Sequence, residues 1–183
     1  MFNTAWGYNG TIFKGNWKNI DPNTNVIGMF AEIGGHIEVD YDSTTGFQSR
    51  NELKTAVDAY IGNKIIALGI YGNIKDWNVS NVTDMSELFR LVQKFNGDVS
   101  NWDVGNVTNM SYMFSQCDVF NQDLNNWDVS KVTNMSYMFH YCAIAFDLDN
   151  WDTGNVTDMS YMFHYSHRFN NNIDTWNVSK VTD

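Results

Sequence analysis

Residues 127–139 read Trp127-Asp-Val-Ser-Lys-Val-Thr-Asn-Met-Ser-Tyr-Met-Phe139, and nearly the same text precedes them at Trp102-Asp-Val-Gly-Asn-Val-Thr-Asn-Met-Ser-Tyr-Met-Phe114. The tryptophans that open such stretches are spaced by 25, 25, 24 and 25 residues. They are Trp77, Trp102, Trp127, Trp151 and Trp176. A fixed period of this length predicts a repeat solenoid, because one repeat alone cannot bury its apolar side chains and its neighbours must complete the core.

Each repeat is numbered here from its tryptophan as position 1. Position 6 is Val, position 7 is Thr, position 9 is Met and position 13 is Phe in the four longer repeats. The segment Leu124-x-x-Trp127-x-Val129 resembles the strand of leucine-rich repeats, with these three side chains inward and Asp128 outward. The following Val-Thr-x-Met-Ser segment predicts a short helical turn with the position-7 Thr as its N-cap. Met and Phe, four residues apart, then lie on one side of that turn.

The period defines the expected domain organisation. Residues 1–46 do not share it, and the run from Val26 to Tyr41, broken by Gly34-Gly35, predicts a β-hairpin within an N-terminal β-rich region. Residues 47–72 hold a predicted capping helix from Ser49 to Ile61 and a connector. Residues 73–183 form the predicted solenoid of about 4.5 repeats, which stops in mid-motif at the C-terminus.

Composition excludes several classes of function. The net charge is -10, and the absence of a basic stripe argues against nucleic acid. No apolar run is long enough to insert into a membrane. The first residues lack the pattern of a signal peptide. Cys117 and Cys142 lie one period apart, close enough for a disulfide if the repeats stack, although free cysteines packed as small apolar side chains are the favoured interpretation.

The repeat text resembles the BspA-like leucine-rich-repeat surface proteins. The resemblance rests on Asn-Trp-Asp-Val-Ser-Lys-Val-Thr-Asn-Met-Ser-Tyr-Met-Phe and on the Val-Thr-x-Met-Ser-x-Met-Phe-x-x-Cys block from Val107 to Cys117. It covers residues 47–183, and it implies a surface protein that is displayed outside the cell, on a cell surface or on a virion.

Two columns of residues are the candidate interaction face. The first is polar and follows the predicted strands. Its members are Asn78, Asn101, Asp103, Asn126, Asp128, Asn150, Asp152 and Asn177. Three stacked carboxylates in it, Asp103, Asp128 and Asp152, repel one another, so either neighbouring polar groups or a bound Ca²⁺ ion must offset their charge. A solvated acidic ladder without a metal is the simpler interpretation.

The second column is aromatic and consists of Tyr112, Tyr137 and Tyr161 at position 11. It either packs on the edge of the repeats or forms an exposed stripe for a partner. His140 and His164 share position 14, and with His167 they suggest either a metal site or a solvated loop. The eight Asn-x-Ser/Thr sequons arise mostly from the repeat text itself and are weak evidence for glycans.

No catalytic motif is found, and neither an enzymatic activity nor a cofactor is expected. The sequence favours a non-enzymatic recognition or adhesion module that binds a protein or glycan through the exposed face of the solenoid. The alternative is a structural spacer or a decoration subunit of a larger assembly, such as a virion or an extracellular filament. The incomplete last repeat predicts either a longer chain or a neighbouring molecule that covers the end.

Overall fold

The computed structural model describes residues 41–183. The chain divides into residues 1–42 and 43–183, and the second unit holds everything described below. The predicted hairpin at Val26–Tyr41, nearly all of the predicted β-rich region and His36 lie outside the described residues.

Helix α2 spans Arg50–Gly62, which confirms the helix predicted from the sequence. The side chain of Ser49 caps its start by accepting a hydrogen bond from the backbone N–H of Glu52 at 3.2 Å, as a helix N-cap does. A second helix, α3, spans Lys64–Tyr71 and was not predicted. It escapes prediction because Asn63 both ends α2 and caps the start of α3 through its side chain. A residue read from the sequence as the end of one helix therefore also begins the next.

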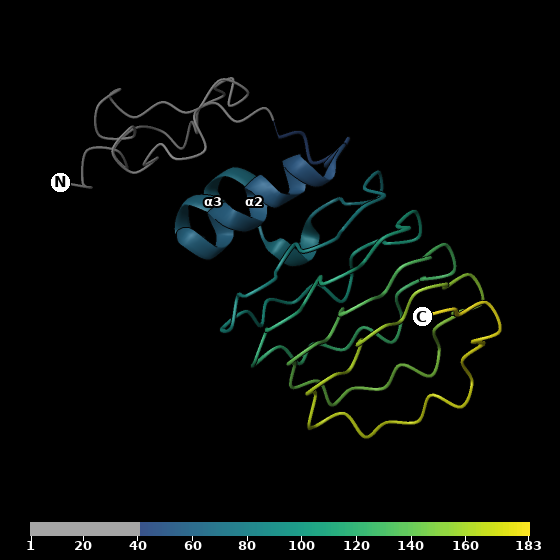
Figure 1. The fold of residues 1–183 in the computed structure, drawn as a ribbon. Helices are drawn as coiled ribbons and strands as arrows, with labels where there is room; N and C mark the ends of the chain where they lie inside the picture. The colour runs from purple at the N-terminus through teal and green to yellow at the C-terminus, as the bar shows by residue number, and fades with distance from the viewer. Residues whose placement is uncertain (1–40) are drawn as a thin grey trace, which may run out of the picture. The chain divides into compact units, whose positions relative to one another are not determined.

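The two helices pack on the first repeat (Figure 1). Leu53 and Val57 of α2 are fully buried. Tyr60 and Tyr71 contact the ring of Trp77, with centroids 6.1 and 5.8 Å away. These contacts place the helices over one end of the repeat core.

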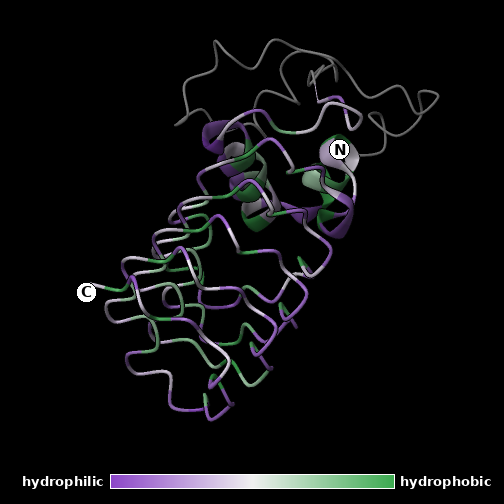
Figure 2. Cartoon of the chain, turned by 90° about the vertical axis from the view of Figure 1, so that its right-hand side faces the viewer, coloured by the Kyte–Doolittle hydropathy of each residue, from purple (hydrophilic) through white to green (hydrophobic). Residues whose placement is uncertain are grey.

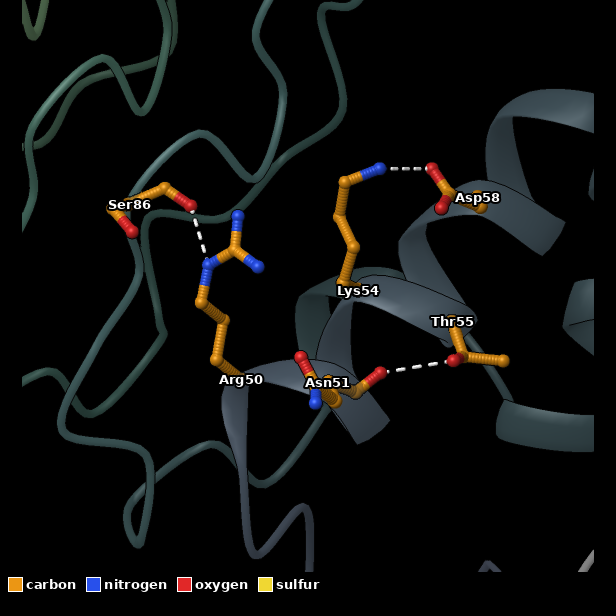
Figure 3. A network of polar contacts seen from close by, with 6 residues as sticks. All are labelled: Arg50, Asn51, Lys54, Thr55, Asp58 and Ser86. Carbon is orange, nitrogen blue, oxygen red and sulfur yellow. Dashed lines mark hydrogen bonds and ion pairs between the residues drawn. The ribbon is translucent and has the colours of Figure 1, made fainter. Parts of the chain in front are cut away.

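Polar contacts fix the start of α2 (Figure 3). Arg50 Nε donates to the backbone carbonyl of Ser86 at 2.8 Å, which ties the helix to the first repeat.

Lys54 and Asp58 form an ion pair on the outer side of α2. A 3₁₀ turn at Ile74–Asp76 then leads into the repeats.

From residue 73 onward the chain winds past itself once per repeat (Figure 1). Isolated parallel bridges join position 8 of neighbouring repeats: Asp84 to Asn109, Asn109 to Asn134, and Asn134 to Asp158. Backbone amides at positions 9, 11, 13 and 15 donate to the next repeat, for example Phe89 N to Met113 O at 2.9 Å. Main-chain hydrogen bonds therefore hold the repeats in register over much of each turn.

The core consists of columns of identical side chains, and apolar and polar stretches alternate along every repeat (Figure 2). Phe114 stacks between Phe89 and Phe139, with ring centroids 5.4 and 5.8 Å apart. Trp127 is buried, and its indole N–H donates to the backbone carbonyl of Val99 in the preceding repeat at 3.1 Å. The same bond recurs at Trp102, Trp151 and Trp176. The tryptophan therefore supplies both apolar area and a partner for a buried carbonyl.

The short helical turn predicted after position 6 is wrong, because the described part of the chain contains no helix beyond Asp76. The position-7 Thr is not an N-cap. Instead, Thr108 donates from its amide and its hydroxyl to the carbonyl of Thr83, at 2.8 and 3.2 Å. The expected burial is correct, since Leu124, Trp127 and Val129 are buried and Asp128 is exposed. The hydrogen bonds between repeats nevertheless concentrate after the predicted strand.

The repeat that is one residue short keeps this hydrogen bonding, since Thr157 N donates to Thr133 O at 2.8 Å. Its aromatic ring shifts from position 19 to position 20, at Phe146. Phe95 and Phe120 of the preceding repeats stack at 5.8 Å, whereas Phe146 stands edge-on to Phe120 at 6.3 Å and 88°. The column of stacked position-19 rings is therefore interrupted in this repeat.

Candidate functional site

The candidate tyrosines occupy an unusual backbone conformation. Position 11 has a positive φ in all four longer repeats, at Glu87 (58°), Tyr112 (57°), Tyr137 (56°) and Tyr161 (55°). Position 11 is the third residue of a tight turn, since Met113 N donates to Met110 O at 3.2 Å. A type II turn normally takes Gly or Asn there. A side chain larger than glycine in this region costs roughly 1–2 kcal/mol.

Position 15 repeats the same conformation. Its residues are Leu91 (67°), Gln116 (60°), Tyr141 (54°) and Tyr165 (60°). Each of the four longer repeats thus contains two strained turns. Hydrogen bonds to the following repeat hold both turns in the first three: Tyr137 N donates to Ser160 O at 2.9 Å, and Tyr141 N donates to His164 O at 3.0 Å. The stack of repeats therefore enforces a conformation that the residue types alone disfavour.

Tyrosines at the strained positions 11 and 15, together with histidines at position 14, build an aromatic surface, which we call the aromatic strip. It consists of Tyr112, Tyr137, Tyr161, His140, His164, Tyr141 and Tyr165. Tyr137 stacks on Tyr112 at 4.5 Å and on Tyr161 at 4.8 Å. Tyr141 stacks on Tyr165 at 4.5 Å. The His column bridges the two Tyr columns, because His140 touches Tyr137 at 5.4 Å and Tyr141 at 4.7 Å.

The outer rings of the strip are accessible. Tyr161 is 56% exposed, Tyr165 is 48% exposed and Tyr141 is 45% exposed. Arg90 covers the ring of Tyr112 at 4.8 Å. Because the rings stack face to face, the strip presents mainly their edges and hydroxyls.

The surroundings of the strip disfavour the charged forms of Tyr137 and His140. Burial, helped by the neighbouring Tyr112 and Tyr161, raises the pKa of the Tyr137 phenol. Burial, followed by the influence of His164, lowers the pKa of His140. His140 therefore favours its neutral form near neutral pH. The rings of His140 and His164 stack at 5.5 Å, so the structure brings these two predicted neighbours together.

The polar column has a local structural role that the sequence did not reveal. At position 2, Asp128 Oδ1 accepts the backbone N–H of Ser130 at 3.0 Å. Asn78, Asp103, Asp152 and Asn177 accept the N–H of position 4 in the same way. An Asx turn of this kind requires Asp or Asn. The hydrogen bonds from Ser130 lower the pKa of Asp128, with a further contribution from Lys131.

The outward residues of the middle repeats meet in a shallow hollow of about 410 Å³. Asn126, Asp128, Asn150 and Asp152 line it together with Asn125. Asn78, Asn101, Asp103 and Asn177 do not line it. Most of the polar column is exposed, whereas Asn78 is half-buried and donates to the carbonyl of Thr44 at 3.3 Å. Only part of the column surrounds a recess with amide and carboxylate groups.

The three candidate carboxylates do not form a cation cage. Asp103 and Asp128 both approach Gly105: their oxygens Oδ1 and Oδ2 lie 3.4 and 3.2 Å from the position that a Cβ atom on this glycine would take. Asp103, Asp128 and Asp152 each turn one oxygen onto their own backbone. Within residues 41–183, no group of three or more His, Cys, Asp or Glu side chains is placed to hold a metal ion.

The repeats match one family model. The model describes a Mycoplasma protein of unknown function, DUF285, and it matches residues 62–147 and 142–183. The chain belongs to the DUF285 family. Neither the curated proteins nor the solved structures include a match to this chain.

The two cysteines of the DUF285 repeats are not bonded to each other. Cys117 and Cys142 are buried and free, so a disulfide is not formed. Cys117 Sγ donates to Phe89 O at 3.0 Å, and Cys142 Sγ donates to Cys117 O at 3.2 Å. Burial raises the pKa of both thiols, that of Cys142 to about 12.

The sequence did not single out Tyr141 and Tyr165, which belong to the aromatic strip of the DUF285 repeats. Their common position 15 was the available signal, but that position also holds Leu91 and Gln116.

Among the helices described between residues 41 and 183, none is both long enough and apolar enough to cross a membrane.

Proposed function

We propose that this chain is a non-enzymatic recognition module, built as a leucine-rich-repeat-like solenoid and displayed at a cell or virion surface. The hydrogen bonds and ring columns between repeats support the solenoid. The resemblance to BspA-like surface proteins supports display. The aromatic strip carries the proposal of recognition, because five tyrosines keep a strained backbone while their rings stack in columns.

A protein is favoured over a glycan as the partner. Sugars bind aromatic residues through ring faces, and stacking at 4.5–4.8 Å covers both faces of Tyr137 and one face each of Tyr112 and Tyr161. Edges and hydroxyls remain outside, and tyrosines that combine an apolar body with a polar tip are enriched at protein interfaces. Stacking also fixes the rings before binding, which lowers the entropy cost of association.

The test is a binding assay on panels of immobilised extracellular-matrix proteins, serum proteins and glycans. We expect the full chain to bind at least one protein, and we expect Tyr137→Ser with Tyr161→Ser to weaken that binding at least ~10-fold, as loss of interface anchors does. The matched control is Lys131→Gln, an exposed position of the same repeat outside the strip. Circular dichroism establishes that each variant is folded. Equal binding by the strip variant and the control would contradict the proposal.

A further inference from the structure

A groove between the helices and the first repeat lies apart from the aromatic strip. It has a volume of about 730 Å³ and is lined by residues of α2, α3, the 3₁₀ turn and the back of the first repeat. This volume is in the range of small-molecule sites. Its apolar wall includes Ile61, which is 41% exposed, and the buried Phe95.

Three lysines from three different segments line this groove. Lys64 begins α3, Lys75 lies in the 3₁₀ turn, and Lys94 follows the second strained turn of the first repeat. None of the three ammonium groups has a carboxylate within ion-pair distance among the described residues. Lys64 Nζ lies 5.1 Å from the centroid of the Tyr60 ring.

Basic side chains elsewhere in the described part are mostly engaged with protein groups. Lys54 and Arg90 form ion pairs, and Arg50, Lys131 and Lys180 donate hydrogen bonds to oxygen atoms. The groove therefore gathers unpaired positive charge on a chain whose net charge is -10. Unpaired like charges that meet at one recess repel one another, and an anion would relieve this repulsion.

One acidic residue, Asp98, also lines the groove. Its Oδ1 accepts the backbone N–H and the hydroxyl of Ser100, at 3.1 and 2.7 Å. These bonds, with a smaller contribution from Lys75, lower the pKa of Asp98. Asp98 offsets one of the three lysine charges, so the groove keeps a net positive charge.

We propose that this groove binds a small anionic ligand, with its carboxylate, sulfate or phosphate group on Lys64, Lys75 and Lys94 and its apolar part against Ile61 and Phe95. The inference is independent of the aromatic strip and of the proposed function. Amphiphilic anions fit because the lining of the groove combines three lysines with apolar side chains.

The probe is 8-anilinonaphthalene-1-sulfonate, whose fluorescence rises on binding to the full chain, with neutral N-phenyl-1-naphthylamine as the matched control ligand. We expect the sulfonate to bind and the neutral compound to bind at least ~10-fold more weakly, as three weak ion contacts would produce. Lys64→Gln/Lys75→Gln/Lys94→Gln should remove that difference, whereas Lys131→Gln/Lys180→Gln should keep it. Added salt should weaken the binding of the sulfonate.

Displacement distinguishes the kinds of anion. If 1-naphthoate, naphthalene-1-sulfonate or 1-naphthyl phosphate displaces the fluorescent sulfonate, the site is supported, and the most effective of the three identifies the preferred acid group. If the neutral 1-naphthol displaces it equally well, the proposal is overturned. If the triple variant does not fold, Lys64→Gln and Lys94→Gln alone must each weaken binding of the sulfonate. Unchanged binding in these variants, or no binding of the sulfonate to the folded chain, overturns the proposal.

Discussion

Replacement of Gln116 by glycine should stabilise the protein. Gln116 has a φ of 60°, and its amide donates to the carbonyl of His140 at 2.7 Å. Its side chain makes no hydrogen bond within the described part of the chain, so the substitution costs no side-chain hydrogen bond. Relief of a left-handed conformation is worth roughly 1–2 kcal/mol. The added freedom of glycine in the unfolded chain offsets about 0.4–1 kcal/mol of this gain.

The net expectation for Gln116→Gly is a rise of about 0.5–1 kcal/mol in the free energy of unfolding. Urea denaturation followed by tryptophan fluorescence should show a midpoint higher by roughly 0.25–0.5 M, given the denaturant slopes of small proteins. Gln116→Ala keeps the strain and should leave the midpoint near that of the parent chain.

Gln93 provides the matched control, because it is an exposed glutamine near the same edge of the neighbouring repeat and its φ is not positive. Gln93→Gly should lower the free energy of unfolding by about 0.4–1 kcal/mol, the ordinary effect of glycine. If Gln116→Gly lowers stability as much as Gln93→Gly does, the assigned backbone strain is refuted.

Three further predictions concern the core, the strip and the thiols. Phe114→Ala should lower the free energy of unfolding by about 3–5 kcal/mol in urea denaturation, because it opens a cavity between two stacked rings; a cost under ~1 kcal/mol would contradict this packing. The pKa of His140 in the folded chain lies below its ordinary value. Its neutral form therefore contributes stability at pH values above the pKa of the unfolded chain, and this contribution is lost as the pH falls through the lower pKa of the folded chain. NMR titration should show that the pKa of His140 rises in His164→Asn. Cys117 and Cys142 should resist Ellman's reagent at pH 8 until the chain unfolds, since burial disfavours the thiolate; rapid labelling of the folded chain would show that they are accessible.

The sequence predicted the core because apolar periodicity reports burial directly. Trp127, Val129 and Phe139 recur at fixed positions, and the structure buries all three. The start of α2 was also predicted, with Ser49 or Asn51 as its cap, and the structure places the cap at Ser49. By contrast, the helical turn after position 6 was wrong. Local propensity at that segment is overruled by hydrogen bonds to residues about 25 positions away, such as that of Met110 to Asn134.

The sequence predicted which residues form the candidate site better than it predicted what those residues do. Position 11 was recognised as a Tyr column, but its left-handed backbone was not, because Tyr gives no sign of a positive φ. Position 2 was taken for an exposed ladder, and Asp128 does stand outside, yet its Oδ1 also closes a turn. The groove escaped prediction entirely, since Lys64, Lys75 and Lys94 meet only when the helices pack on the first repeat.

The amino-acid sequence by itself determined the period, the side chains that fill the core and the boundary between the helical segment and the repeats, because these depend on which residues recur and at what spacing. Only the tertiary structure decided the backbone of each turn and the surfaces that result from it. Stacked repeats exchange hydrogen bonds and ring contacts that no single repeat can form. Those contacts hold Tyr112, Tyr137 and Tyr161 in a conformation that a free chain would avoid.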